Sequence, residues 1–409
     1  MVTYRSLFAV REFRYLYPGM ALSYLGDQFA KIAVAVLVFD RTGSAFVTAV
    51  AYASSMLPAL GGPLLGAYAD RLPRKRVLIA CDLVRAVLVA VLVTPGLPIW
   101  LAIGLLYVLH LFTSPFTAAR AALMPEVLAG DAYVTGNGLT NVTFQLSQLV
   151  GLAVGGVMVT VVHPRGALAL DAVTFAASAV LIVVGVRARP APSRGAAGAS
   201  RPSLLQDTKD GARYVFSDPW LRNCLLVVWA ASTFAFAFEG IAYPYAKELH
   251  GGSATAGVML ASTALGFTLG AILLTRVVSP ATRDRLLAPF AVAASAVLVL
   301  AFAGPPLWAV LAILFVTGIG ASFSAPLNAI FVRRVAAEYR GRAMGVAIAG
   351  ITAGQGLGFL LAGALGSTSL SLATVVGLCG LVGAAATATA ALGWQRAVAA
   401  TADEPAVVG

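Results

Sequence analysis

Charged residues are scarce in this sequence. They make up 11% of its 409 residues, and only 17 side chains are acidic. A soluble globular protein of this length needs more polar residues to cover its surface, so the composition excludes that class. The 59% of residues that are hydrophobic instead indicate an integral membrane protein.

Cysteine and histidine are also rare, with three residues of each. Cys81, Cys224 and Cys379 lie far apart in apolar surroundings and lack the spacing of metal ligands, so we interpret them as small hydrophobic residues. A Gly-rich loop ending in Gly-Lys-Ser or Gly-Lys-Thr is missing as well, which argues against ATP hydrolysis. We therefore expect no enzyme, no catalytic residues, no bound metal and no cofactor.

The hydrophobic residues form continuous runs of about 20 residues, a length that suits transmembrane helices and not the alternating strands of a barrel. The charged segment before residue 15 shows no cleavage site, so the first run should remain as a spanning helix. The sequence thus predicts an all-α integral membrane protein with twelve transmembrane helices. The predicted spans are 15–39, 44–69, 76–95, 98–120, 136–162, 166–188, 219–246, 253–278, 286–303, 306–331, 341–365 and 369–393.

The segment 189–218 in the middle of the chain differs in composition from both halves. It begins with RPAPSRGAAGASRPS, which indicates a flexible linker, and continues with apolar residues at helical spacing, which predict an interfacial amphipathic helix. We expect an N-terminal six-helix bundle at 1–188, a cytoplasmic linker at 189–218, a C-terminal six-helix bundle at 219–394 and a cytoplasmic tail at 395–409.

Basic residues are distributed unevenly over the loops that these spans define. If the N-terminus is cytoplasmic, 23 of the 28 Lys and Arg residues fall on the cytoplasmic side. Positive loops stay inside, so we expect both termini in the cytoplasm. The net charge of +11 then indicates a basic belt against anionic lipid headgroups and not a nucleic-acid surface, since no basic and aromatic residues interleave.

The turn between the second and third spans, GAYADRLPRKR, carries five charges in seven residues. Its basic residues suit an anchor on the cytoplasmic side, and a simple anchor is one interpretation of the whole turn. Asp70 weakens such an anchor, however. A carboxylate at this position is better explained as the partner of an arginine or a helix N-terminus in one state of the protein.

Two halves of six spans, the central linker and this turn resemble the major facilitator superfamily. The residues that fit its loop motif are Gly66, Asp70, Arg71, Arg74 and Lys75. A proline replaces the usual turn glycine. The resemblance implies two pseudo-symmetric bundles around a central cavity, and a cytoplasmic gate in which Asp70 meets Arg340 and Arg342 at the start of the eleventh span.

The fifth span resembles the glycine-rich motif of antiporters in this superfamily. The residues that follow its spacing are Gly138, Ser147, Gly151, Leu152, Gly155 and Gly156, of which the serine and the leucine depart from the motif. Small residues four apart let helices approach closely, so ordinary helix packing is the alternative. The stretches SYLGDQFAKIAVAVLVFDRTGSA, LIACDLVRA and LDAVTFAASAVLI are most similar to the branch of the enterobactin exporter and of multidrug and macrolide efflux proteins.

Ionisable residues inside a membrane are costly and therefore mark functional sites. Asp27 and Lys31 are four residues apart near the middle of the first span, on one helix face, where they can pair. We interpret them as a proton-coupling or substrate-binding pair, with a static ion pair as the alternative. Glu239 holds the corresponding place in the seventh span. No charged residue stands three or four positions before it, which suits a proton carrier.

The remaining ionisable groups divide into candidates and structural residues. His110 stands in the middle of the fourth span, where the superfamily's drug/proton antiporters have a buried arginine. Histidine titrates near neutral pH in water, so His110 is a candidate for proton coupling or substrate binding. The alternative is a hydrogen-bonded residue that serves only helix packing. Asp82 and Arg85, three apart on the third span, predict a structural pair near its cytoplasmic end. Asp171 is expected near the outer end of the sixth span, capping it or pairing with Arg165.

These features together predict a secondary active transporter of the bacterial cytoplasmic membrane. We expect a monomer that exports small amphipathic organic molecules, such as a drug, siderophore or secondary metabolite, by alternating access and in exchange for protons. A metabolite importer or facilitator without proton coupling is the first alternative. A sensor or scaffold that no longer transports is the second.

Overall fold

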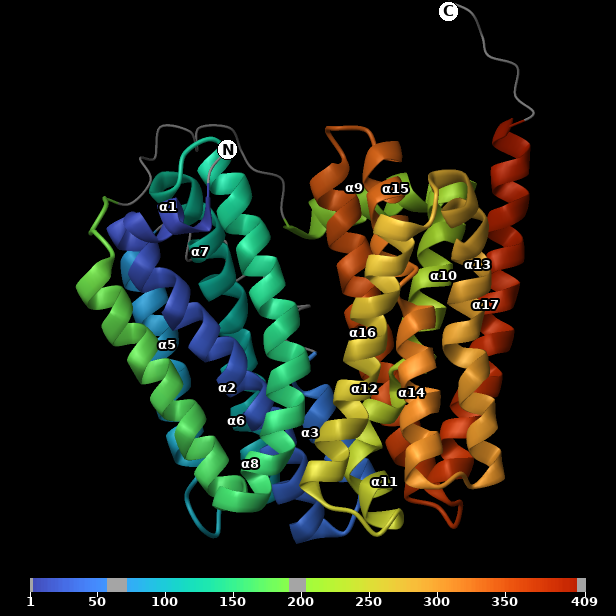
Figure 1. Cartoon of the computed structure of the whole chain (residues 1–409), viewed down its shortest axis with the longest axis horizontal. Coiled ribbons are helices and arrows are strands. Elements are labelled where there is room, and N and C mark those ends of the chain that lie inside the picture. The colour runs from blue at the N-terminus through green and yellow to red at the C-terminus, as the bar shows by residue number, and fades with distance from the viewer. Residues whose placement is uncertain (1–2, 57–71, 191–203, 403–409) are drawn as a thin grey trace, which may run out of the picture. The chain divides into compact units, whose positions relative to one another are not determined.

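The computed structural model describes residues 3–56, 72–190 and 204–402, which form helices without any strand (Figure 1). The chain divides into two compact units. The first contains Met1–Arg201 and His250–Ala261, and the second contains Pro202–Leu249 and Ser262–Gly409. The predicted all-α membrane fold is confirmed.

The first unit is built mainly from seven described helices. They are α1 (Tyr4–Ala9), α2 (Arg11–Thr42), α3 (Ala45–Ala53), α5 (Arg74–Leu92), α6 (Ile99–Leu111), α7 (Thr113–Val127) and α8 (Asp131–Gly185). The second unit is assigned most of the remaining elements. They are α9 (Leu204–Ser217), α10 (Pro219–Ala235), η2 (Ala237–Ile241), α11 (Ala242–Glu248), α12 (Ser253–Ile272), η3 (Leu273–Val277), α13 (Pro280–Ala296), η4 (Val297–Ala303), α14 (Leu307–Ala321), α15 (Ser324–Arg334), α16 (Arg340–Gly366) and α17 (Leu372–Ala402). The first turns of α12 belong to the first unit.

Nine helical segments of the described chain are long and apolar enough to cross a membrane. One of them, α8, contains both the fifth and the sixth predicted spans, because it bends at His163, where φ is +61°. Pro164 follows and cannot donate a backbone hydrogen bond, so the helix turns here without a loop. The third predicted span is α5, which carries too many charges to count among the nine. The second predicted span begins in α3 and continues into residues outside the described ranges.

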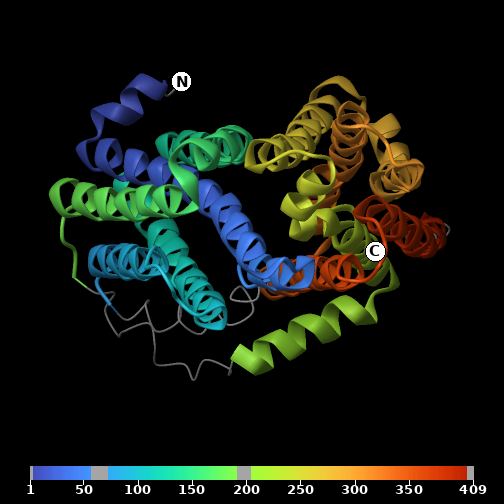
Figure 2. The same cartoon turned by 90° about the horizontal axis from the view of Figure 1, so that it is seen from below.

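In the first unit, α2 packs along both halves of α8 (Figures 1 and 2). Glycines allow this close approach. A Cβ atom on Gly155 would lie 3.0 Å from the Phe29 ring, and one on Gly26 would lie 2.3 Å from the Asp171 carboxylate. Backbones that approach this closely gain packing contacts that lipid alone does not provide.

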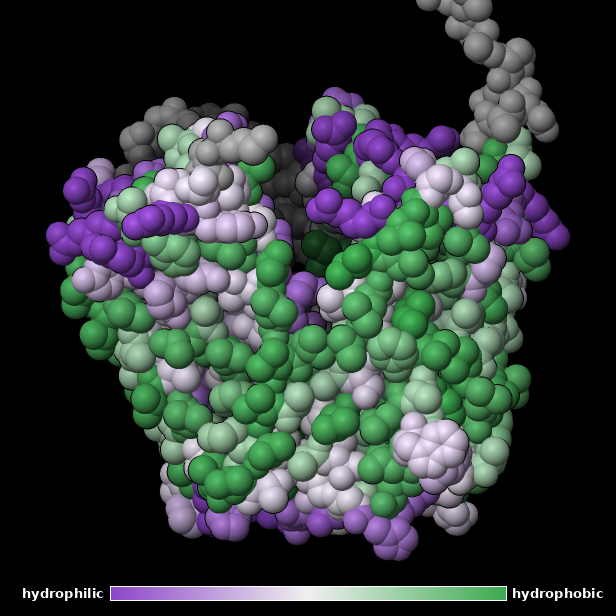
Figure 3. Space-filling view, in the orientation of Figure 1, coloured by the Kyte–Doolittle hydropathy of each residue, from purple (hydrophilic) through white to green (hydrophobic). Residues whose placement is uncertain are grey.

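In the second unit, α10 packs against α16, α17 and α13. Gly350, Gly354 and Gly358 form a stripe on α16 that faces Trp229 and Thr233 of α10. The Trp229 indole also donates a hydrogen bond of 3.1 Å to a carbonyl of α16. The surface of this unit in Figure 3 is hydrophobic along α12, α13 and α14 and hydrophilic at the helix ends, as expected for a membrane protein.

Helix α9 covers the segment for which the sequence predicts an amphipathic helix. Val215 on its apolar face is fully buried, and the Tyr214 ring stacks on Tyr339 with 4.3 Å between centroids. Gly211 lies against the backbone of Arg342 at the start of α16. The helix is therefore packed onto the second unit through its apolar face.

Candidate functional site

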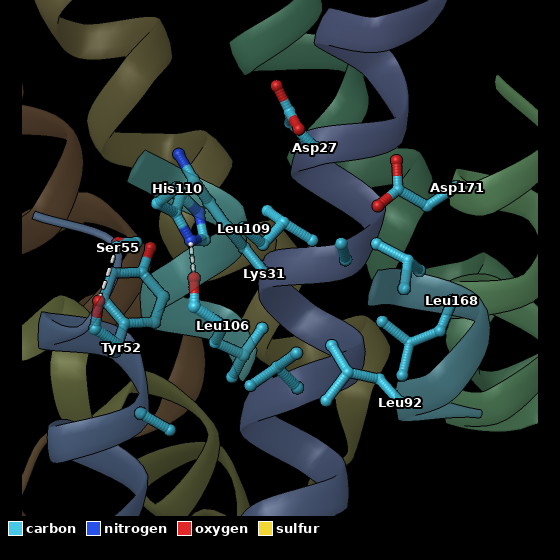
Figure 4. Close-up of a pocket in the computed structure, with 14 residues that line it drawn as sticks. Asp27, Lys31, Tyr52, Ser55, Leu92, Leu106, Leu109, His110, Leu168 and Asp171 are labelled. Carbon is cyan, nitrogen blue, oxygen red and sulfur yellow. Dashed lines mark hydrogen bonds between the residues drawn. The ribbon is translucent and has the colours of Figure 1, made fainter. Parts of the chain in front are cut away.

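A small cavity lies inside the first unit, between α2, α3, α5, α6 and α8 (Figure 4). Its volume is about 30 Å³. That space holds roughly one or two water molecules. The polar side chains that line it are Asp27, Lys31, Tyr52, Ser55, His110 and Asp171, and the remaining lining is apolar. The cavity therefore combines water-sized space with two acids and a lysine.

Helix α2 supplies Asp27 and Lys31, one turn apart. Lys31 donates a hydrogen bond of 3.2 Å to the Oε1 atom of Gln28, a buried residue of the same helix. Within the described ranges, no ion pair joins Asp27 to Lys31 and no hydrogen bond reaches the Asp27 carboxylate. Helical spacing permits the predicted pair, but Figure 4 shows the Lys31 side chain extending to the His110 side of the cavity. The two charges thus share the cavity without direct contact.

His110 enters the cavity from the last turn of α6. Its Nδ1 atom lies 2.7 Å from the carbonyl oxygen of Leu106. A carbonyl only accepts, so Nδ1 must carry the proton in this hydrogen bond, and in the neutral ring Nε2 keeps its lone pair. His110 is thus oriented by its own helix, as in the packing alternative, and it also lines the cavity.

Asp171 lies in the second half of α8, and its exposed fraction is only 1%. The sequence places it near the outer end, beside Arg165. The structure instead packs its carboxylate against the backbone of Gly26 and brings it to the same cavity as Asp27. No ion pair with Arg165 occurs in the part of the chain that the structure describes.

Asp82 and Arg85 form a buried ion pair on α5. Their side chains are 0% and 2% exposed, and the Nη2 atom of Arg85 lies 2.5 Å from Oδ1 of Asp82. The guanidinium is held between two rings, 4.4 Å from the centroids of both Phe116 and Phe175. Within the described part of the chain, the second Asp82 oxygen and the Nε atom of Arg85 are buried without a hydrogen-bond partner. The pair is therefore deep in the unit, and not at the helix end where the sequence suggests it.

A charged network closes the end of the first unit at which α2 begins. Arg189 binds Glu12 through both terminal nitrogens, at 3.0 and 2.6 Å, and its Nε atom lies 3.4 Å from Glu126. Glu126 also pairs with Arg74. Lys75 donates to the carbonyls of Val183 in the last turn of α8 and of Val186 just after it, at 2.8 and 2.7 Å, where the helix dipole favours a cation.

The predicted gate residues fall into three groups. Arg74 and Lys75 make the contacts just described within the first unit. Arg340 donates to the Val335 carbonyl at 3.3 Å, and the Arg342 guanidinium lies 5.7 Å from the Tyr339 ring centroid, both within the second unit. The others, Gly66, Asp70 and Arg71, lie outside the described residues.

Glu239 lies where the seventh predicted span is interrupted. The chain passes there from α10 through the short 3₁₀ segment η2 into α11, and Glu239 is part of η2. The following residue, Gly240, packs against Phe359 of α16, where a Cβ atom would approach to 2.8 Å. The acid is half-buried at a helix break in the second unit.

The glycine motif of α8 packs in two directions. Gly151 and Gly155 face α2, and Ser147 is buried. Gly156 faces the first turn of α12, where Ser253 donates a hydrogen bond of 3.0 Å to the Gly156 carbonyl. An added Cβ on Gly138 would meet no atom of the described structure within 4 Å, so no helix approaches the motif at this glycine.

Replacing Gly156 by alanine is expected to lower stability, because its Cβ would lie 2.5 Å from the Ser253 carbonyl and 3.0 Å from the Gly257 backbone. Backbone atoms cannot move aside cheaply, so we expect a loss of about 1–3 kcal/mol. Gly138→Ala on the same helix is the matched control and should be neutral or slightly stabilising. Thermal unfolding in detergent measures both, and equal stability of the two variants would contradict the close contact.

Two acids of this unit, Glu12 and Glu126, were not singled out from the sequence. For Asp171 the sequence predicted a cap or a pair with Arg165, and not a place in this cavity. For Glu12 a signal existed, since it lies between Arg11 and Arg14, whereas Glu126 has no basic residue nearer than Arg120 in the sequence. For Asp171 the only signal was its place in the apolar stretch LDAVTF, where an acid needs an explanation.

Comparisons with known proteins agree with this fold. The profile of the Major Facilitator Superfamily matches residues 16–288 and 240–407. The chain is 27% identical over 368 residues to the multidrug efflux pump Tap of Mycolicibacterium fortuitum, covering 86% of this chain and 88% of that protein. It is 26% identical over 222 residues to macrolide efflux protein A of Streptococcus pyogenes, covering 53% of this chain and 54% of that protein.

Solved structures show the same fold at lower identity. The nucleoside transporter NupG superposes with a TM-score of 0.67 at 14% identity, covering 94% of this chain and 99% of that one. A bacterial homologue of the iron transporter ferroportin, in its inward-facing state, superposes with a TM-score of 0.66 at 15% identity, covering 96% of this chain and 99% of that one. The sequence profile spans nearly the whole chain, and the chain therefore belongs to the major facilitator superfamily of membrane transporters.

Proposed function

We propose that this chain exports small amphipathic organic molecules across the bacterial cytoplasmic membrane by alternating access, in exchange for protons. Similarity to a multidrug efflux pump and to a macrolide efflux protein supports export and the substrate class. In this proposal both termini are cytoplasmic, because the basic residues gather on that side, and the basic belt contacts anionic headgroups. The transporter acts as a monomer.

The cavity of the first unit carries the proposal of proton coupling. Asp27 lines it without an ion pair or hydrogen bond in the described structure, and a charged carboxylate without a partner is costly in a membrane. Binding a proton removes that cost. With about 30 Å³, the cavity is far smaller than a typical drug-sized pocket of about 300–1,000 Å³. It therefore suits a proton and water, and the organic substrate binds elsewhere.

Other assigned residues complete the proposed cycle. Glu239 is a second candidate for the proton, at the helix break of the second unit. Asp70, with Arg340 and Arg342, remains the cytoplasmic gate predicted from the sequence, in which the carboxylate stabilises the outward-facing state.

Transport into everted membrane vesicles tests the proposed function. Vesicles from cells that express the chain receive an imposed pH gradient, acid inside, and either a macrolide or a fluorescent amphipathic dye. Accumulation that a proton ionophore collapses is expected, because proton exit then drives substrate entry into the vesicle. Vesicles without the chain are the control. Equal uptake with and without the gradient would support a facilitator instead and would contradict antiport.

A further inference from the structure

Asp171 combines deep burial with access to the cavity. Its exposed fraction is 1%, yet it lines the same water-sized space as Asp27, and Figure 4 shows both carboxylates among the lining side chains. The two acids come from different helices, α2 and α8, which pack closely at Gly26. Two acids from separate elements thus share one small cavity.

The hydrogen bonds around Asp171 do not satisfy its carboxylate. The hydroxyl of Thr174 lies 2.8 Å from the backbone carbonyl of Asp171 and 3.4 Å from its Oδ1 atom. A hydroxyl donates one proton, and the short contact to the carbonyl uses it. No ion pair reaches Asp171 among residues 3–56, 72–190 and 204–402. Its carboxylate is thus buried with neither a cation nor a full hydrogen-bond donor.

The charged groups nearby bind other partners in the described structure. On α5, Arg85 pairs with Asp82 and not with Asp171. On α2, the Lys31 ammonium binds Gln28. His110 of α6 donates its Nδ1 proton to its own helix.

Among the described residues, three acids, Asp27, Asp82 and Asp171, therefore face two cations, Lys31 and Arg85, in the core of this unit. Full ionisation of all three would leave unpaired negative charge inside the membrane, which is strongly disfavoured.

We propose that Asp171 is a second proton-binding residue of the transporter, and that it exchanges a proton with Asp27 through water in the cavity. The inference rests on the proposed proton antiport. An O–H bond at one carboxyl group breaks while one forms at the other, and the intervening water donates one proton as it accepts another. Repulsion between the two acids disfavours the state in which both are ionised, so they titrate as a pair. Asp171 thereby stores the proton while Asp27 is ionised.

Two variants, Asp171→Asn and Asp27→Asn, test this inference in the full-length protein. We expect Asp171→Asn to lose accumulation driven by the pH gradient while it keeps exchange of labelled for unlabelled substrate in the absence of a gradient. Retained exchange shows that the variant is folded and binds substrate. Thr174→Val is the matched control, because it removes the hydroxyl beside Asp171 but leaves both carboxyl groups, and it should keep coupled transport.

Proton release gives a second measurement that a purely structural role would not change. Saturating substrate is added to purified protein in weak buffer with a pH-indicating dye. The measurement is repeated over a range of pH. We expect proton release by Asp171→Asn to shift to lower pH than in the wild type, because Asp27 then titrates without the repulsion of a second acid. Unchanged release and unchanged coupled transport in Asp171→Asn, with Asp27→Asn defective, would overturn the inference and leave the proposed function intact. If both variants behave as the wild type does, the inference and the proposed proton antiport are both overturned.

Chemical labelling of the wild-type protein keeps the inference testable if Asp171→Asn does not fold. Dicyclohexylcarbodiimide reacts with protonated carboxyl groups in apolar surroundings. Peptide mapping by mass spectrometry should find both Asp27 and Asp171 labelled. Labelling of Asp27 alone would overturn the role of Asp171. An imposed sodium gradient that drives transport without a pH gradient would also overturn it, because the pair would then bind a metal cation and not a proton.

Discussion

Asp27→Asn is expected to abolish the accumulation of substrate that a pH gradient drives. The asparagine keeps the shape of the side chain but cannot release a proton, and no described residue pairs with Asp27, so no ion pair is broken by the change. We therefore expect a folded protein that still exchanges labelled for unlabelled substrate. Accumulation in everted vesicles and exchange without a gradient, measured on the same preparation, separate coupling from binding.

Asp131→Asn provides the matched control for this experiment. It makes the same chemical change at an exposed position in the first turn of α8, away from the cavity. Coupled transport should survive it. If Asp27→Asn still accumulates substrate in response to the pH gradient as the control does, Asp27 is not the coupling acid, and Glu239 in the second unit becomes the residue to replace next.

Removal of the Arg85 charge is expected to cause the largest loss of stability. Arg85→Met keeps a long side chain between the Phe116 and Phe175 rings but leaves Asp82 buried without its cation. Breaking a buried pair on one side costs about 3–5 kcal/mol, because an uncompensated charge remains. The free energy of unfolding, measured by titration with a denaturing detergent, should fall by that amount.

The double variant Asp82→Asn/Arg85→Met identifies the cause of the loss. It removes both charges with little change in side-chain size, so it should recover much of the stability that Arg85→Met loses. If the double variant is as unstable as the single one, the loss comes from the contacts of the guanidinium with the two rings and not from an unpaired carboxylate.

The helical spans were predictable because their signals are local. Apolar runs of membrane length and the charged turns between them depend only on neighbouring residues, and the all-α membrane fold follows from them. Breaks inside the spans were harder to predict. The 3₁₀ segment at Glu239 lies where Gly240 packs against Phe359 of another helix, a contact that the local sequence does not encode.

The candidate site was predictable only in part. Asp27, Lys31 and His110 could be selected because each is a polar residue in an apolar span. Their contacts could not be predicted. Asp27 and Gln28 both lie within one turn of Lys31, and which of them accepts its hydrogen bond depends on the packing around the cavity. The position of Asp171 beside the cavity depends on where α8 bends and on how α2 packs against α8. Those are properties of the packed unit and not of either helix alone.

The charged network of the first unit also has a consequence for biosynthesis. Glu12 is synthesised at the start of the first long helix, but its partner Arg189 follows 177 positions later. Until the ribosome has completed α8, the Glu12 carboxylate and the Lys75 ammonium must remain at the membrane surface without these partners. We therefore expect this end of the unit to assemble late, after all its helices have been inserted, and nascent chains that stop before residue 189 to stay open at this end.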